Sequence, residues 1–143
     1  MTIKIGILED RRSFASNLKL LIQMENPDAE ICVFHGVDDA IKSILEKTDW
    51  DFWIVDLMMS KGVSMTHSET ENGLSTGYRF VARMVENGVN VSKKIIIYTS
   101  RDTGNPDLIE NDYVIEEVQK AHTSVVAIAK KIRKESDEGQ SNE

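Results

Sequence analysis

The sequence predicts an α/β fold in which helices cover both faces of a parallel β-sheet. Short apolar runs alternate with segments of helical spacing, and the alternation repeats about five times along the chain. Three of the runs are apolar at consecutive positions, apart from Lys4 in the first: Ile3–Leu8, Ile54–Val55 and Ile95–Ile97. Such strands are buried on both faces, as in parallel sheets that lie between two layers of helices. The predicted class is therefore a doubly wound α/β domain.

The strands are expected where apolar residues run with little interruption. Four segments have this character: Ile3–Leu8, Glu30–Phe34, Phe52–Val55 and Lys94–Tyr98. A fifth strand near Ile115–Gln119 is a weaker prediction, because Glu116 and Glu117 interrupt its apolar pattern. Trp50 and Trp53 flank or lie in the third strand, and we expect them to be aromatic residues of the core or its rim.

Amphipathic helices are expected between the strands, because apolar residues recur there with helical spacing. The predicted apolar faces are Phe14, Leu18, Leu21 and Ile22; Val37, Ile41, Ile44 and Leu45; Tyr78, Val81, Ala82 and Val85; and Val125, Val126, Ile128, Ala129 and Ile132. A further helix around Pro106–Val114 is a weaker prediction.

The chain has 143 residues and a hydrophobic fraction of 41%, which suits one domain with a substantial core. We expect this domain to span residues 1–134 and the polar segment 135–143 to be disordered. The formal charge of −7 argues against direct binding of nucleic acid, whose phosphates attract basic surfaces. No stretch is suited to insertion in a membrane, and the first residues lack the pattern of a signal peptide. The single cysteine, Cys32, is expected to be a small buried hydrophobe in a cytoplasmic protein.

One polar segment, Ser60–Gly77, has no periodicity and is expected to be a loop. It is long for a connection in a compact α/β domain, which indicates either function or mobility. Gly73 and Gly77 are expected to permit the turn into the following helix. The loop also contains three candidate ligands for a second metal site, although a solvated loop is the favoured interpretation: His67, Glu69 and Glu71.

Polar residues that could bind a ligand or take part in a reaction follow four of the expected strands. They are Glu9 and Asp10 after the first strand, Asp56 after the third, Thr99 and Ser100 at the end of the fourth, and Lys120 after the fifth. Parallel strands bring their carboxyl ends to one edge of the sheet, which is where doubly wound folds bind ligands. We therefore expect these residues to meet there.

The chemistry of such a cluster can be inferred from its groups. Three carboxylates brought together repel one another unless a cation compensates them. A hard cation such as Mg²⁺, with Mn²⁺ as an alternative, prefers oxygen ligands, so these carboxylates and the backbone carbonyl of Met58 suffice to hold it. A nearby hydroxyl and a lysine would bind the oxygens of a phosphoryl group. One carboxylate would then be the nucleophile.

The segments that carry these residues resemble the receiver domain of response regulators in two-component signalling. The resemblance runs from Ile3 to about Lys134 and is carried by "IGILEDRRSF", "DFWIVDLMM", "IIIYTS" and "VQKAHTSVVAIAKKI". It implies a flavodoxin-like, five-stranded parallel sheet in the order 2-1-3-4-5. That fold agrees with the pattern of strands and helices.

The resemblance also implies a role for each site residue. Asp56 would be the phosphorylated residue, and Glu9 and Asp10 would hold Mg²⁺ with it, Asp10 being the more direct ligand. Thr99 would bind the phosphoryl group and report its presence. Lys120 would form an ion pair with it.

A stand-alone phosphorylation switch is the function that this resemblance implies. A sensor histidine kinase or a histidine phosphotransfer protein would donate the phosphoryl group. The domain would catalyse its own phosphorylation and dephosphorylation at most, without turnover of external substrates. The response would pass through a protein–protein interaction surface to a separate downstream protein.

The sequence departs from the family pattern in three places. Ala121 stands where a proline usually follows the lysine, and Glu117 stands where an aromatic switch residue is expected. The connection after Asp56 is longer than usual, reading "MSKGVSMTHSETENG". Met58 and Arg101, besides Glu117, are candidate modulators of the lifetime of the phosphoryl group.

These departures leave alternatives open. One is a receiver-like interaction module, or pseudo-receiver, that is not phosphorylated. If the fifth strand lay earlier in the sequence, Glu116 would occupy the place of the lysine and the site would be degenerate. A phosphatase with an aspartate nucleophile is disfavoured, because Met58 stands where such enzymes, by resemblance, carry a second acid.

Overall fold

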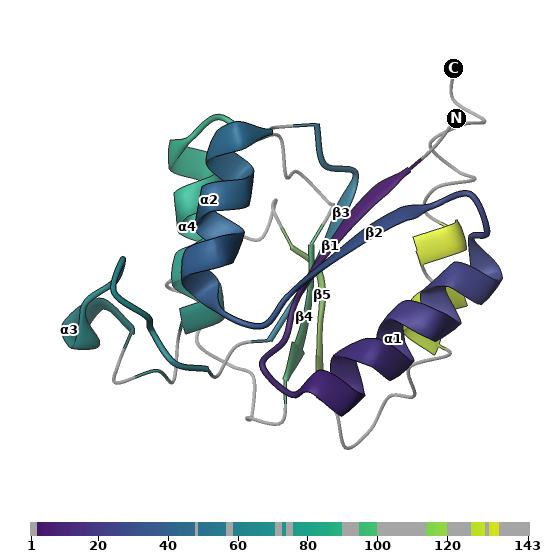
Figure 1. Ribbon diagram of the computed structural model, residues 1–143, viewed down its shortest axis with the longest axis horizontal. Helices are drawn as coiled ribbons and strands as arrows, with labels where there is room; N and C mark the ends of the chain where they lie inside the picture. The colour runs from purple at the N-terminus through teal and green to yellow at the C-terminus, as the bar shows by residue number, and fades with distance from the viewer. Residues whose placement is uncertain are drawn as a thin grey trace.

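A computed structural model of the protein shows a three-layer α/β fold, with one β-sheet between two layers of helices (Figure 1). The structure describes residues 3–47, 49–56, 59–70, 73, 76–89, 95–99, 114–119, 127–130 and 132–134. One face of the central sheet is covered by α1 (Arg12–Glu25), and the other is covered by α2 (Val37–Glu46) and α4 (Thr76–Glu86). The short helix α3 (His67–Thr70) projects away from the sheet beside α4.

The central sheet has five strands, and every pair of neighbours is parallel. The strands are β1 (Lys4–Leu8), β2 (Glu30–Phe34), β3 (Phe52–Val55), β4 (Ile95–Thr99) and β5 (Val114–Gln119). Their order is β2-β1-β3-β4-β5, which confirms the predicted topology. The predicted strand bounds agree with the structure to within one residue at each end.

The fifth strand confirms the weaker of the strand predictions. It pairs with β4 in a register that joins Thr99 to Gln119, with an irregularity between Ile95 and Ile96. Val114, which was predicted at the end of the preceding helix, is instead the first residue of this strand. The rest of that predicted helix, residues 106–113, lies outside the described residues.

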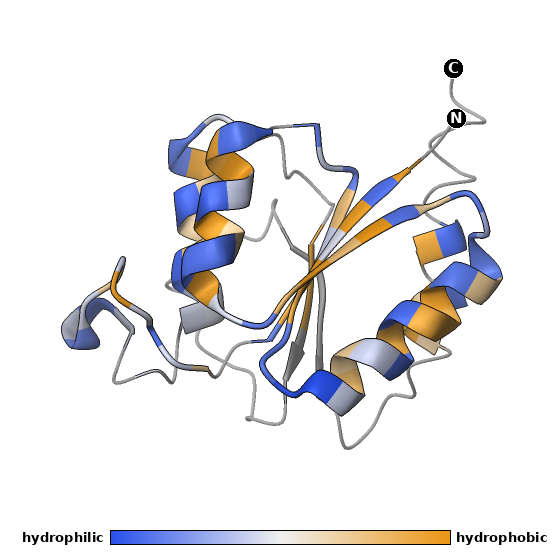
Figure 2. Ribbon diagram, viewed as in Figure 1, coloured by the Kyte–Doolittle hydropathy of each residue, from blue (hydrophilic) through white to orange (hydrophobic). Residues whose placement is uncertain are grey.

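Two apolar clusters lie on opposite faces of the sheet. The strands contribute residues to both, because successive side chains point to opposite faces. In β3, Trp53 and Val55 face α2 and α4, whereas Phe52 and Ile54 face α1. The cluster on the α1 face also includes Ile128, Ala129 and Ile132, from the helical residues 127–130 and 132–134. Figure 2 shows hydrophilic residues on the outer side of α2 and α4 and apolar residues on the side towards the sheet. The prediction of burial on both faces is confirmed for β1, β3 and residues Ile95–Ile97 of β4.

The predicted helix faces are correct for α1 and partly wrong for α2 and α4. Leu45 in α2 is 60% exposed and Val85 in α4 is 37% exposed, although both were predicted to face the core. The other predicted residues of these two faces are buried or partly buried, and Ala40, Phe80 and Met84 join them in the core. The predicted faces are therefore wrong only at Leu45 and Val85, which lie at their margins.

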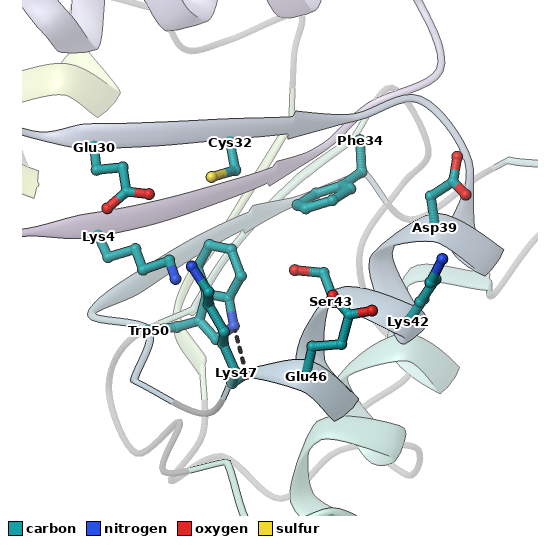
Figure 3. Close-up of a pocket in the computed structure, with 10 residues that line it drawn as sticks. All are labelled: Lys4, Glu30, Cys32, Phe34, Asp39, Lys42, Ser43, Glu46, Lys47 and Trp50. Carbon is teal, nitrogen blue, oxygen red and sulfur yellow. Dashed lines mark hydrogen bonds between the residues drawn. The ribbon is translucent and has the colours of Figure 1, made fainter.

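A hollow of about 350 Å³ opens between the edge strand β2 and α2 (Figure 3). Phe34 and Trp50 form its aromatic side, with ring centroids 6.2 Å apart, and the Trp50 indole donates to the Lys47 carbonyl at 3.0 Å. Cys32 also lines the hollow. This thiol packs against the core, as expected of a small hydrophobe, but it is only partly buried. The cause is the position of β2 at the edge of the sheet.

Among the described residues, the longest apolar helical stretch falls short of what a membrane-spanning helix requires.

An aromatic group packs directly on the backbone of β1, and it confirms that Trp50 and Trp53 are core aromatics. Trp53 stacks against Phe34 at 5.7 Å and meets Phe80 edge-on at 4.9 Å between ring centroids. Gly6 is paired with Trp53 across β1 and β3. A Cβ atom added to Gly6 would lie 2.5 Å from the indole ring. Only glycine leaves room for this ring.

We predict that Gly6→Ala destabilises the protein by about 1–3 kcal/mol, because the new methyl group overpacks a filled core. Gly36→Ala is the matched control, since a Cβ there meets no atom within 4 Å. The free energy of unfolding, measured by urea denaturation, should fall much less for the control. Equal losses in the two variants would contradict the packing role of Gly6.

Candidate functional site

Three carboxylates converge at the carboxyl ends of β1 and β3. Glu9 and Asp10 follow β1, and Asp56 follows β3. One carboxylate oxygen from each residue lies within 4.8 Å of the others. Glu9 is 2% exposed and Asp56 is 7% exposed, whereas Asp10 is exposed. The acids of two separated segments therefore meet at one edge of the sheet.

Backbone hydrogen bonds fix two of these acids at the end of the sheet. The Asp56 amide donates to the Leu8 carbonyl at 2.9 Å, and the Glu9 amide donates to the Phe34 carbonyl at 3.0 Å. These bonds continue the strand ladders by one residue beyond β3 and β1. The sheet therefore holds the backbone of both acids.

The donor set suits a hard divalent cation. Ligand atoms on opposite sides of Mg²⁺, with bonds of about 2.0–2.1 Å, lie roughly 4.2 Å apart. The carboxylate oxygens all lie within 4.8 Å of one another, a range that includes this separation and the shorter ones between adjacent ligands. Two buried acids and one exposed acid also leave one side of the cluster open to solvent and ligands. Glu9, Asp10 and Asp56 therefore fit Mg²⁺ by chemistry and by spacing.

Only the backbone of Thr99 belongs to the described part of this site. Thr99 is the last residue of β4, which pairs with β3, so it ends at the same edge of the sheet as Asp56. Its side chain lies outside what the structure describes. The predictions for Met58, Ser100, Arg101 and Lys120 likewise fall on residues outside the described ranges.

The register of β5 removes one alternative. Glu116 pairs with Ile96 and Glu117 with Ile97, both well inside the strand. The strand continues to Gln119, so Glu116 does not stand where the strand ends. The hypothesis that Glu116 takes the place of the lysine was therefore wrong, because β5 extends three residues beyond it.

The segment after Asp56 is more ordered than the predicted loop. It contains α3, and α4 begins at Thr76, so Gly77 lies inside a helix and not in the turn as predicted. Gly73 does make the turn, with a φ of 92° that favours glycine. Met59 donates its amide to the Gly73 carbonyl at 3.1 Å and accepts from the Thr76 hydroxyl at 2.8 Å. These hydrogen bonds join the two ends of the segment 59–76, which is called the connecting segment below.

A reciprocal cap begins α3. The Thr66 amide donates to the Glu69 carboxylate at 2.9 Å, and the Glu69 amide donates to the Thr66 hydroxyl at 3.0 Å. The sequence signal for such a capping box, Thr followed three residues later by Glu, was present and was missed. The backbone hydrogen bond from Thr66, together with the Arg83 guanidinium 3.0 Å away, lowers the pKa of Glu69.

The cap engages one of the three candidate ligands of a second metal site. The Glu69 carboxylate is used by Thr66 and Arg83, and His67 is exposed. Glu71 lies outside the described residues. Among the residues that the structure describes, the cluster at Glu9, Asp10 and Asp56 is the one group with metal-ligand spacing.

Asp38, in the first turn of α2, binds the middle of the connecting segment. Its carboxylate accepts from the Val63 amide at 2.9 Å, from the Ser64 amide at 3.0 Å, and from the Ser64 hydroxyl. Gly62 has a φ of 64°, and a side chain there would collide with Asp38. Desolvation raises the pKa of Asp38, but the hydrogen bonds from Ser64 and Val63 outweigh it and lower the pKa. Sequence reasoning missed this residue, because nothing local to Asp38 indicates a partner 25 residues away.

Comparisons with solved structures identify the fold. A CheY-like receiver domain from Methanospirillum hungatei JF-1 superposes with a TM-score of 0.73, 13% identity and full coverage of both chains. The receiver domain of a DNA-binding response regulator from Colwellia psychrerythraea 34H gives 0.69 and 22% identity, over 94% of this chain and 98% of that one. A Burkholderia pseudomallei response regulator, solved with a phosphorylated aspartic acid, calcium and citrate, gives 0.64 and 17% identity, over 98% of this chain and 72% of that one.

The sequence matches no protein-family model and no curated protein.

We predict that Asp38→Asn destabilises the protein by about 0.5–1 kcal/mol at pH 7, a low value because the bonds are partly exposed to solvent. A carboxyl whose pKa is lowered by folding stabilises the fold above its ordinary value of 3.8, and this contribution is lost as the pH falls through the folded value. The difference between wild type and variant, from urea denaturation, should therefore shrink below about pH 4.

Asp39→Asn is the control for this measurement, because Asp39 is the exposed neighbour in the same helix turn. A pH-independent difference for Asp38→Asn, or an equal one for the control, would contradict this role of Asp38.

The predicted topology, the convergence of the strand ends and these superpositions lead to one structural identification: the chain has the fold of response regulator receiver domains.

Proposed function

We propose that this protein is a Mg²⁺-dependent phosphorylation switch in which Asp56 accepts a phosphoryl group. The observation that supports the proposal is the convergence of Glu9, Asp10 and Asp56 at one edge of the sheet. The cytoplasmic donor is the phosphohistidine of a sensor histidine kinase or a histidine phosphotransfer protein. The response passes to a separate protein through a change in an interaction surface.

The chemistry follows from the position of each acid. An Asp56 carboxylate oxygen attacks the phosphorus atom, and the bond between phosphorus and the donor imidazole breaks as the new P–O bond forms. Glu9, Asp10 and Asp56 hold the divalent cation, which supplies compensation for the charge of the phosphoryl oxygens. The open side at the exposed Asp10 is where the phosphoryl donor approaches.

The two buried acids, Glu9 and Asp56, differ from the exposed Asp10 in how they would contribute to a cation site. The negative charges of three carboxylates held this close repel one another, and a bound cation would relieve that repulsion. Asp10, being exposed, keeps part of its solvation and exchanges water for a ligand more easily. The cluster is therefore suited to weak, reversible binding of the metal.

The Burkholderia neighbour supports this proposal by analogy of fold. That protein carries a phosphorylated aspartic acid and a calcium ion on a structure similar to this one. Thr99 and Lys120 are proposed as the groups that bind the phosphoryl oxygens here. Both follow from the sequence resemblance and remain predictions.

An interaction module that is not phosphorylated is the second candidate. It is favoured by Glu117, which lies in β5 opposite Ile97 where the family has an aromatic switch residue. Ala121 in place of proline points the same way. In this case the fold would present a surface without control by a phosphoryl group.

We predict that incubation with Mg²⁺ and a small acyl phosphate adds the mass of one phosphoryl group to the intact protein. The adduct should be absent from Asp56→Asn and present in Asp39→Asn, which removes an acid that is not part of the cluster. Intact mass spectrometry makes the measurement. A wild-type protein that stays unmodified, while a known receiver is modified under the same conditions, would favour the interaction module.

We also predict that Mg²⁺ binds the unphosphorylated protein weakly, with a Kd in about the millimolar range, as expected for an open carboxylate site. Asp10→Asn should raise this Kd about tenfold, because it removes one of three anionic ligands. Amide chemical shifts followed by NMR during a Mg²⁺ titration measure both constants. An unchanged Kd in Asp10→Asn would remove Asp10 from the site.

A further inference from the structure

His35 is a residue that neither the motifs nor the fold comparison brings to the site. It follows β2 directly, at the same edge of the sheet as the acids. Its Nδ1 atom lies 3.0 Å from the backbone carbonyl oxygen of Glu9, and the side chain is half-buried. A carbonyl oxygen only accepts hydrogen bonds, so the ring must carry a proton on Nδ1 and donate it.

The position of this bond on the backbone gives it a particular effect. The accepting carbonyl belongs to the peptide unit that joins Glu9 to Asp10, and the peptide unit is planar. The preceding unit is held by the Glu9 amide, which donates to the Phe34 carbonyl at 3.0 Å. The end of β2 therefore holds the acid pair at two successive peptide units. Only the second of these bonds depends on a side chain.

The orientation of that peptide unit determines where both carboxylates point. The Cα atoms of Glu9 and Asp10 stay about 3.8 Å apart whatever the orientation of the plane. A change in ψ of Glu9 or φ of Asp10, however, alters the direction in which one carboxylate points relative to the other. Glu9 is also held by its burial, at 2% exposure, whereas Asp10 is exposed. Asp10 therefore depends more strongly on the hydrogen bond from His35.

We propose that His35 is a positioning residue of the cation site, which orients the Glu9–Asp10 peptide unit by donating its Nδ1 proton to the Glu9 carbonyl. The inference rests on the proposed function, because it assigns His35 to the cation site described there. Groups that orient metal ligands typically change metal affinity by about 10–100-fold when they are removed. At this site, with one bond to a backbone carbonyl, we expect the lower end of that range.

Three variants separate the hydrogen bond from the bulk of the ring. His35→Ala removes both, His35→Phe keeps a ring without the donor, and His35→Asn keeps a donor at a position similar to Nδ1. The Kd for Mg²⁺, measured by NMR titration, should rise about tenfold in the alanine and phenylalanine variants. In His35→Asn it should stay within about threefold of wild type, because the amide replaces the donor.

A second readout tests positioning against general destabilisation. Phosphorylation by a small acyl phosphate should be slow in His35→Phe at low Mg²⁺ and should return to the wild-type rate at saturating Mg²⁺. Loss of the fold would not be repaired in this way. If His35→Ala does not fold, the phenylalanine and asparagine variants still give the comparison.

The outcomes distinguish this inference from the function on which it rests. Wild-type protein that binds no Mg²⁺ would overturn both. If the Kd for Mg²⁺ rises in Asp10→Asn but is unchanged in His35→Phe, the role of His35 is overturned and the switch is left intact. Equal weakening in His35→Asn and His35→Phe would also overturn it, because the donor would then be irrelevant.

Discussion

The pairing of Gly6 with Trp53 is the contact that sets the geometry of the rest of the molecule. A large indole packs over a residue without a side chain, and a Cβ at that position would collide with the ring. A slip of one residue between β1 and β3 would place a side chain under the ring and turn each apolar residue to the opposite face. The same slip would move Asp56 by about 3.3 Å along the sheet relative to Glu9. Packing in the core therefore sets the register, and the register brings the acids together.

The strands and the acid cluster could be predicted because their signals are local. Consecutive apolar residues such as Ile95–Ile97 leave no polar face, and an acid directly after such a run has to lie at the strand end. The faces of α2 and α4 were harder to predict, because Leu45 and Val85 satisfy helical spacing as well as the residues that are buried. Packing against the sheet chooses between these faces, and the spacing alone does not contain that information.

The structure of the connecting segment after Asp56 could not be predicted for a different reason. Its order comes from polar side chains that bind backbone amides far away in sequence, such as Asp38 with Val63 and Ser64. These residues have no apolar pattern, and polar segments of this kind are commonly read as mobile loops. The capping pair of Thr66 and Glu69 was the one local signal. The roles of Thr99 and Lys120 came from resemblance, because hydroxyls and lysines near strand ends are common in any α/β protein.

The position of β2 at the margin of the sheet has a consequence for the behaviour of the protein in concentrated solution. The Glu30 amide donates to Ile3, so alternation directs the backbone groups of Ile31 and Val33 away from β1. Backbone N–H and C=O groups that point outward from an edge strand can pair with a strand of a second molecule and start aggregation. The charged side chains of Glu30, Lys42, Glu46 and Lys47 line the hollow beside this margin. Their hydration opposes the approach of an apolar strand, so these surface charges contribute to keeping the molecules apart.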